Sequence, residues 1–144
     1  MDDHDIEAVL ARHVAAENAH DLDATLDTLH PDCVFEDVAL GKVYRGHEGA
    51  AAYYRSWWDA FGLQFRRGDD GALHVTADGQ AVAEGHFHGR HVGTFLGIAP
   101  TGRPIDFRFV VVVTFRDGRM AGERFYYDSE TLRRQLMGND QAGR

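Results

Sequence analysis

Residues 105–116, IDFRFVVVVTFR, constrain the fold of this chain more than any other segment. Successive side chains of a β-strand point to opposite faces, so an alternating pattern buries one face. The apolar residues on the shared face are Phe107, Phe109, Val111 and Val113. The turn sequence RDGR follows, and residues 119–127 return with Phe125 and Tyr127 continuing the apolar face. This pattern predicts an antiparallel sheet with one buried face.

Earlier segments extend the predicted sheet. Residues 63–67, 72–77 and 80–95 read as strands, with a turn at ADGQ, and the loop GIAPTGRP leads into residue 105. In the strand at 80–95, Ala81, Ala83 and Phe87 share the core-facing phase. Strand alternation then sends a polar set to the outer face of the sheet, namely Glu84, His86, His88 and Arg90.

Helical periodicity dominates the first 61 residues. Residues 5–19 form an amphipathic pattern that Asp3 or Asp5 is suited to cap. The segment HDLDATLDTLHPD predicts a second helix, with Asp21 as N-cap and Pro31 ending it. The short strand CVFEDV follows, then the turn ALGKVYRG and a helix over 47–61; SETLRRQLMG closes the chain as a helix with Ser129 as cap. Helices first and sheet afterwards indicate an α+β fold.

Composition limits the possible functions. The 144 residues are 44% hydrophobic, enough for one domain spanning 1–144. A net charge of −8 argues against nucleic acid or an anionic membrane as partner. No apolar stretch approaches the ~20 residues that cross a bilayer. A single cysteine, Cys33, and an N-terminus unlike a signal peptide lead us to expect a cytoplasmic protein.

The segment GRHVGTFLGIAPTGR, at 89–103, resembles the SnoaL-like polyketide cyclase family of the nuclear-transport-factor-2-like superfamily. NAHDLDATLDTLHPD, DGR at 117–119 and LRRQL agree with that family in order and spacing. The resemblance implies a cone-shaped curved sheet on N-terminal helices, an apolar pocket, frequent dimerisation through the sheet and no cofactor. Relatives include aldol cyclases, isomerases, epoxide-opening enzymes, cofactor-independent hydroxylases and binding proteins, so function must be argued from the site.

The aldol-cyclase branch of the family uses a His and an Asp on the last two strands. The resemblance places those positions at Val111 and Phe125, which cannot transfer a proton. The isomerase and polyether-cyclase branches instead use an acid at the end of the first strand, where this chain has Asp37 in VFED. A carboxylate facing an apolar pocket has a raised pKa, which suits acid/base chemistry. The alternative is an Asp37 that faces water or caps the next turn.

Two residues of the first helix are candidate partners for Asp37. The resemblance puts His13 where the isomerase branch has an oxyanion donor, and its apolar surroundings place it inward. Glu17 lies one turn further; if it points inward beside Asp37, the two carboxylates separate each other's pKa values into an acid and a base. A satisfied core histidine and a solvated glutamate are the alternatives.

The predicted substrate-binding residues are mostly aromatic. The helix at 47–61 carries Tyr53, Tyr54, Trp57 and Phe61 on one face, which suits the flat walls of a pocket for an apolar substrate, with core packing as the alternative. The full predicted set is Tyr54, Trp57, Phe61, His91, Phe109, Val111, Phe125 and Tyr127.

The stretch EGHFHGRHVG raises a metal-site hypothesis. His86 and His88 have a ligand-like spacing, but His91 lies in the opposite strand phase and no carboxylate occurs between residues 89 and 105. We therefore predict no metal, with the first two histidines on the outer face and His91 near the pocket mouth.

Two aspartates outside this stretch are not expected to line the pocket. Asp106 is expected to point away from the pocket, and Asp128 to cap the last helix.

These observations favour a cofactor-independent cyclase or isomerase acting on a polyketide-type substrate. Epoxide hydrolysis or epoxide-opening cyclisation would use the same residues. The same pattern also fits a non-catalytic small-molecule binding protein or a cofactor-independent hydroxylase. A homodimer through the sheet is the expected assembly.

Overall fold

The computed structural model describes residues 1–67 and 71–139. The elements follow in the order α1 (Asp3–Asn18), α2 (Leu22–Asp27), β1 (Leu29–Asp37), β2 (Lys42–Arg45), α3 (Gly46–Phe61), β3 (Gln64–Arg66), β4 (Leu73–Val75), β5 (Ala81–Arg90), β6 (Pro104–Arg116), β7 (Arg119–Tyr127) and α4 (Ser129–Met137). The fold is α+β, as the order of patterns predicted.

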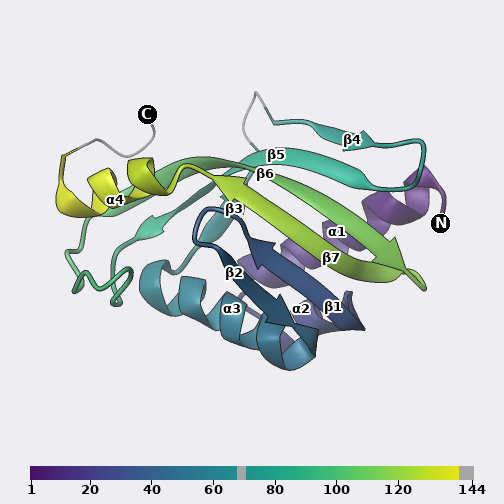
Figure 1. Cartoon of the computed structure of the whole chain (residues 1–144), viewed down its shortest axis with the longest axis horizontal. Coiled ribbons are helices and arrows are strands. Elements are labelled where there is room, and N and C mark those ends of the chain that lie inside the picture. The colour runs from purple at the N-terminus through teal and green to yellow at the C-terminus, as the bar shows by residue number, and fades with distance from the viewer. Residues whose placement is uncertain (68–70, 140–144) are drawn as a thin grey trace.

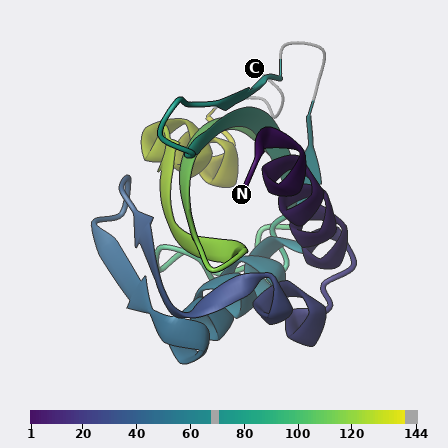
Figure 2. The same ribbon diagram turned by 90° about the vertical axis from the view of Figure 1, so that its right-hand side faces the viewer.

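One curved sheet organises the molecule (Figure 1). Its strand order is β2-β1-β7-β6-β5-β3, and β4 also pairs with β5. Viewed end-on, the sheet curls without closing, with α1 along its open side and α2 and α3 below it (Figure 2). Neighbouring strands are antiparallel except β1 and β7, which run parallel, a feature that the hairpin patterns did not reveal. The apolar phase of β6 is buried, as its alternation predicted.

Local differences from the sequence prediction have simple causes. Helix α1 begins earlier because Asp2 and Asp5 form a reciprocal capping box. Helix α2 is capped by Asp21 as predicted, but it ends at Asp27, and Pro31 already lies within β1. The turn predicted at 39–46 contains the short strand β2. Asp128 is the N-cap of α4, which confirms the cap predicted for Asp128, while Ser129 is the first helical residue. None of these changes moves the buried face of the sheet.

Two glycines of the segment GRHVG let the end of β5 lie directly on α3. A Cβ atom at Gly89 or Gly93 would collide with the backbone carbonyl oxygens of Phe61 and Asp59, respectively. The backbone N–H groups of Val92 and Gly93 both donate to the carbonyl of Ala60, at 2.8 and 3.0 Å. This close approach explains the glycine spacing in the family-like segment.

Candidate functional site

The larger cavity lies between α1 and the inner face of the sheet and has a volume of about 690 Å³. Its apolar wall comes from strands β5 to β7 and is formed by Phe87, Phe109, Val111, Val113 and Met120. Phe109 and Val111 were predicted to line the pocket, and the structure places both of them here. Five ionisable side chains of the described residues border this cavity, and three of them, His13 and Glu17 of α1 and Glu123 of β7, interact with one another.

His13 is the first of these three groups, and three side chains hold its ring. Nδ1 lies 2.8 Å from Oγ1 of Thr28, while Nε2 lies 3.1 Å from the Tyr54 hydroxyl and 3.3 Å from a Glu17 carboxylate oxygen. Burial alone would lower the pKa of His13, but the hydrogen bond and charge of Glu17, with the charge of Glu123, leave this pKa above its ordinary value of 6.5. His13 is therefore biased towards the imidazolium.

Glu17 joins His13 because the two are one helical turn apart on α1. Its side chain is only 15% exposed and borders the larger cavity, so the inward orientation considered from the sequence is the one present. Asp37, the carboxylate expected beside it, borders a different cavity. The carboxylate that accompanies Glu17 in the larger cavity is Glu123.

Glu123 is the residue that sequence reasoning missed. It sits on β7 in register with Val113 of β6 and Phe35 of β1. Burial raises its pKa from 4.5 to about 7, with the Glu17 charge also raising it and the His13 charge opposing. The available signal was strand phase, because Glu123 shares the inward phase of Phe125 and Tyr127. A carboxyl that titrates near neutral pH can take and return protons at the working pH.

Asp37 borders a second cavity of about 410 Å³ between the end of β1, α3 and the loop after β5. The residue is 1% exposed, so it does not face water, but it does cap the following turn, as the alternative prediction had it. The backbone N–H of Leu40 donates to one carboxylate oxygen at 3.0 Å, and the Tyr127 hydroxyl donates to the other at 3.1 Å. Burial raises the pKa of Asp37, while these hydrogen bonds and the charge of Lys42 oppose the rise.

An aromatic partition separates the two cavities. Trp57 of α3 packs against Phe125 and Tyr127 of β7, with ring centroids 6.1 and 5.6 Å apart. Tyr53 and Tyr54 complete the partition, and only a void of about 20 Å³ remains among these side chains. Trp57 also borders the second cavity, whereas Tyr54, Phe125 and Tyr127 line neither large cavity. The predicted aromatic wall therefore exists, but it divides the interior in two.

Two further predicted binding residues border neither large cavity. Phe61 is 2% exposed and packs against Trp57, Phe95 and the His91 ring. His91 is fully buried, and its Nδ1 lies 3.0 Å from Oγ1 of Thr101. Both belong to the packing between the end of α3 and the loop after β5.

The outer face of the sheet carries the other two histidines of the cluster, as strand phase predicted. His86 Nδ1 lies 3.3 Å from Asp106, which also accepts a hydrogen bond from Arg66 at 2.8 Å. Asp106 thus points away from the pocket, as expected. Within residues 1–67 and 71–139, no three His, Cys, Asp or Glu side chains converge as a metal site.

Comparison with known proteins places the chain in a family. A model of the SnoaL-like polyketide cyclase family matches residues 7–136. The chain belongs to this family. It is 29% identical to the aklanonic acid methyl ester cyclase AcmA of Streptomyces galilaeus over 129 residues, which cover 90% of this chain and 88% of the relative.

Solved structures of similar proteins agree with this assignment. TsrD from Streptomyces laurentii is 31% identical with a TM-score of 0.81, over 97% of this chain and 99% of that protein. A candidate polyketide cyclase from Xanthomonas campestris shares the fold at 22% identity and a TM-score of 0.82, over 92% and 97% of the two chains.

The family and its named cyclase support a polyketide cyclase role for this SnoaL-like chain. Among the residues that the structure describes, no helix is long and apolar enough to cross a membrane.

Proposed function

We propose that the protein is a cofactor-independent cyclase that closes a ring of a polyketide-type substrate in the larger cavity. The observation that carries the proposal is the grouping of Glu123 with His13 and Glu17 against an apolar wall. A carboxyl group with a pKa of about 7 is matched to proton transfer near neutral pH. His13 and Glu17 form the pair that gives a proton to the substrate.

In this mechanism, Glu123 removes a proton from a carbon made acidic by neighbouring carbonyl groups. The resulting carbanion forms the new carbon–carbon bond at a second carbonyl carbon of the same substrate. The alkoxide formed there takes a proton from the pair of His13 and Glu17. The proton held by Glu123 then restores that pair, so the reaction is an isomerisation with no net proton change.

The shape of the cavity contributes the second part of catalysis. The rings of Phe87 and Phe109 stack with centroids 4.4 Å apart and form a flat wall opposite α1. Such a wall holds a folded polyketide chain with its reacting carbons close together. Holding reacting groups in this way lowers a barrier by several kcal/mol, up to about 7 to 11 in the best cases. At the positions where the aldol-cyclase branch has its acid and base, Val111 serves as wall and Phe125 as partition.

The buried carboxylates also bear on the non-catalytic alternative. A protein that only binds an apolar molecule gains nothing from ionisable groups whose pKa values are raised by burial. Burial raises the pKa values of both Glu123 and Asp37. This arrangement favours an enzyme over a pure binding protein.

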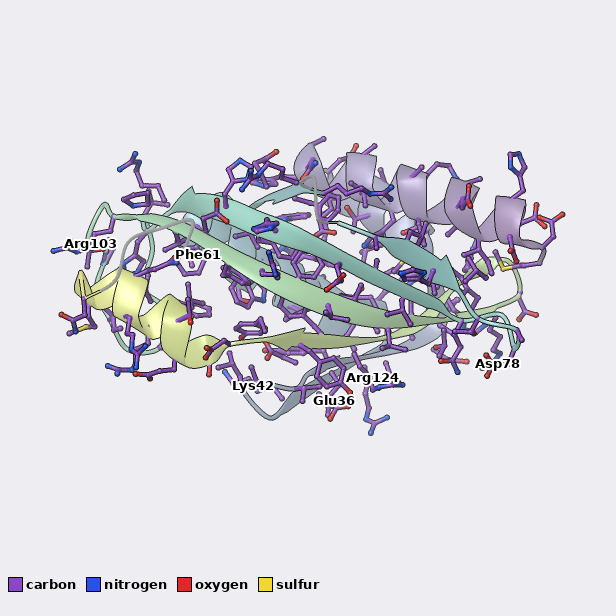
Figure 3. All side chains as sticks on the ribbon, turned by 90° about the horizontal axis from the view of Figure 1, so that it is seen from above. Glu36, Lys42, Phe61, Asp78, Arg103 and Arg124 are labelled. Carbon is purple, nitrogen blue, oxygen red and sulfur yellow. The ribbon has the colours of Figure 1, made fainter. Side chains whose placement is uncertain are left out.

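The proposal is tested with aklanonic acid methyl ester, because the similar protein AcmA is named as its cyclase. Glu123→Gln preserves the shape of the side chain and removes its ability to accept a proton. We expect ring closure to slow by about 10²- to 10⁴-fold, the usual contribution of a general base. The matched control is Glu36→Gln, because Glu36 is on the neighbouring strand and points to the outer face of the sheet, beside Arg124 (Figure 3). Equal turnover of the two variants would exclude Glu123 as the base.

Epoxide opening is the second candidate, and one observation favours it. Asp37 borders the second cavity, and its carboxylate accepts a hydrogen bond from the Tyr127 hydroxyl behind it at 3.1 Å. In this alternative, Asp37 takes the proton of a nucleophilic hydroxyl or water as its oxygen bonds to an epoxide carbon and the C–O bond of the ring breaks, and the freed ring oxygen then takes up that proton. Styrene oxide is a suitable probe: hydrolysis that is lost in Asp37→Asn and retained in Glu123→Gln would favour this reaction over ring closure.

A further inference from the structure

The side chain of Thr28 lies behind His13, on the side of the imidazole ring opposite Glu17 and Tyr54. Thr28 is the C-cap residue of α2 and is 3% exposed, so no solvent competes for its hydroxyl group. Its Oγ1 lies 2.7 Å from the carbonyl oxygen of Thr25 and 2.8 Å from Nδ1 of His13. These two contacts fix which atom donates to which.

A threonine hydroxyl has one proton to donate and two lone pairs that accept. The Thr25 carbonyl oxygen accepts only, so it takes the Thr28 proton. The remaining contact of Thr28 is satisfied when Nδ1 of His13 carries a proton and donates it. The Thr25 carbonyl therefore determines, through the Thr28 hydroxyl, that Nδ1 of His13 carries a proton.

The other ring nitrogen, Nε2, is then the one that gains and loses a proton. In the neutral ring, Nε2 accepts from the Tyr54 hydroxyl at 3.1 Å. In the imidazolium, Nε2–H donates to Glu17 at 3.3 Å. The groups that face the ring are Glu17 of α1, Tyr54 of α3 and Glu123 of β7, and each of them meets the side that carries Nε2 or the cavity.

We propose that Thr28 is a positioning residue that holds the neutral form of His13 in the Nδ1–H tautomer, so that Nε2 accepts a hydrogen bond from Tyr54 and exchanges its proton with Glu17 and the cavity. Thr28 touches no substrate and acts only through the ring. The same pattern, in which a partner on one ring nitrogen determines the chemistry of the other, is general for functional histidines. The inference deepens the ring-closure mechanism and rests on it only for its catalytic consequence.

The tautomer is measured directly by ¹⁵N NMR of the substrate-free full chain, with the His13 signals assigned by their loss in His13→Gln. We expect neutral wild-type His13 to show a protonated Nδ1 and an unprotonated Nε2. The opposite pattern, with the proton on Nε2, would overturn the proposal. This readout needs no activity, so it stands apart from the test of Glu123.

The variants Thr28→Val and Thr28→Ser test whether Thr28 is the cause of the Nδ1–H tautomer. Valine keeps the shape but offers no acceptor, so we expect the neutral ring to move to the Nε2–H tautomer, which donates to Glu17. With the proton on the wrong ring nitrogen, ring closure should fall about 10- to 100-fold, the size of effect known for the outer partners of metal-bound histidines. Serine keeps the hydroxyl and should restore both the tautomer and turnover.

The outcomes separate the two proposals. A Thr28→Val protein that keeps the Nδ1–H tautomer contradicts the positioning role, whatever its activity. A correct tautomer response together with full activity of Glu123→Gln contradicts the ring-closure mechanism and leaves the role of Thr28 in the tautomer intact. If Thr28→Val does not fold, the wild-type and Thr28→Ser spectra still decide the tautomer.

Discussion

Glu123 shows how a single position on a strand determines the chemistry of the interior. Its neighbours in the inward phase of β7 are Phe125 and Tyr127, so its carboxyl group enters a space built for apolar side chains. Burial disfavours the ionised carboxylate, and the positive charge of His13 offsets part of this effect. The result is a carboxyl group with a pKa raised to about 7, at the cost of stability, an exchange that is common at active sites.

This cost predicts a pH-dependent gain in stability for Glu123→Gln. Because the folded-state pKa is raised from 4.5 to about 7, the folded protein keeps this proton over an interval in which the unfolded chain loses it. Wild-type stability should therefore fall by about 3 kcal/mol between these two pH values and stay level above them. Glutamine is neutral throughout and avoids the fall.

Urea unfolding at pH 5, 6, 7 and 8 measures this effect as the difference in the free energy of unfolding between variant and wild type. The difference should grow towards pH 7 and then level off. Glu36→Gln on the outer face should give a small difference that does not change in this interval. A difference for Glu123→Gln that is also constant from pH 5 to pH 8 would show that Glu123 is not held with a raised pKa.

At the same scale, sequence reasoning recovered some site residues and not their grouping. His13 is buried, as helical phase predicted, Asp37, to which the family resemblance pointed, is buried as well, and Glu17 takes the inward one of the two orientations that the sequence left open. Sequence phase states which side a residue faces but not which residues share a cavity. The aromatic partition around Trp57, which divides the interior, depends on how rings from α3 and β7 pack in three dimensions.

At the scale of elements, the contact between α3 and the end of β5 holds the partition in place. The sequence predicted the helix, the strand and the turn residues from periodicity and turn chemistry. It did not predict that β1 runs parallel to β7, because parallel pairing joins strands distant in the chain and leaves no turn signature. The glycines at 89 and 93 carried the signal for close packing, which the family resemblance registered only as a motif.

Gly93→Ala tests this contact. The new methyl group would press on the backbone at Asp59 and Ala60, which cannot move without shifting the end of α3. We expect a loss of about 1 to 3 kcal/mol in the free energy of unfolding, measured by chemical denaturation. Val92→Ala is the matched control, because the Val92 side chain is 57% exposed and should change stability by less than about 0.5 kcal/mol. Equal stability of the two variants would contradict the close approach.

At the scale of the whole molecule, the outer face of the sheet differs from one edge to the other. At the Asp106 end of β5 and β6 it is polar, whereas the other end of these two strands carries Val82, Val110 and Val112. Near β1, β2 and β7 it exposes large apolar side chains, namely Val34, Val38, Val43 and Tyr126. Exposed apolar side chains gathered on one face are typical of an interaction surface.

We expect a homodimer through this face, in keeping with the sheet-mediated dimer that the family resemblance implies. Sedimentation of the wild-type protein at micromolar concentration should give twice the mass of the 16.1 kDa chain. Tyr126→Glu should shift the protein to the monomer, because a charge would then be buried in the interface. A wild-type protein that is monomeric at these concentrations would contradict the expected dimer. A Tyr126→Glu protein that stays dimeric would show that the interface lies on another face.

The central claim is that Glu123 is the base for ring closure, and the pH–rate profile tests it most directly. Aklanonic acid methyl ester, taken from the name of the relative AcmA, serves as the test compound, and its turnover is measured from pH 5 to pH 9 for the wild-type protein and for Glu123→Gln. A base must be unprotonated to act, so the wild-type kcat/KM should rise with pH through an apparent pKa of about 7. The residual rate of Glu123→Gln should lack this rise. An unchanged rise near pH 7 in the variant would contradict the account.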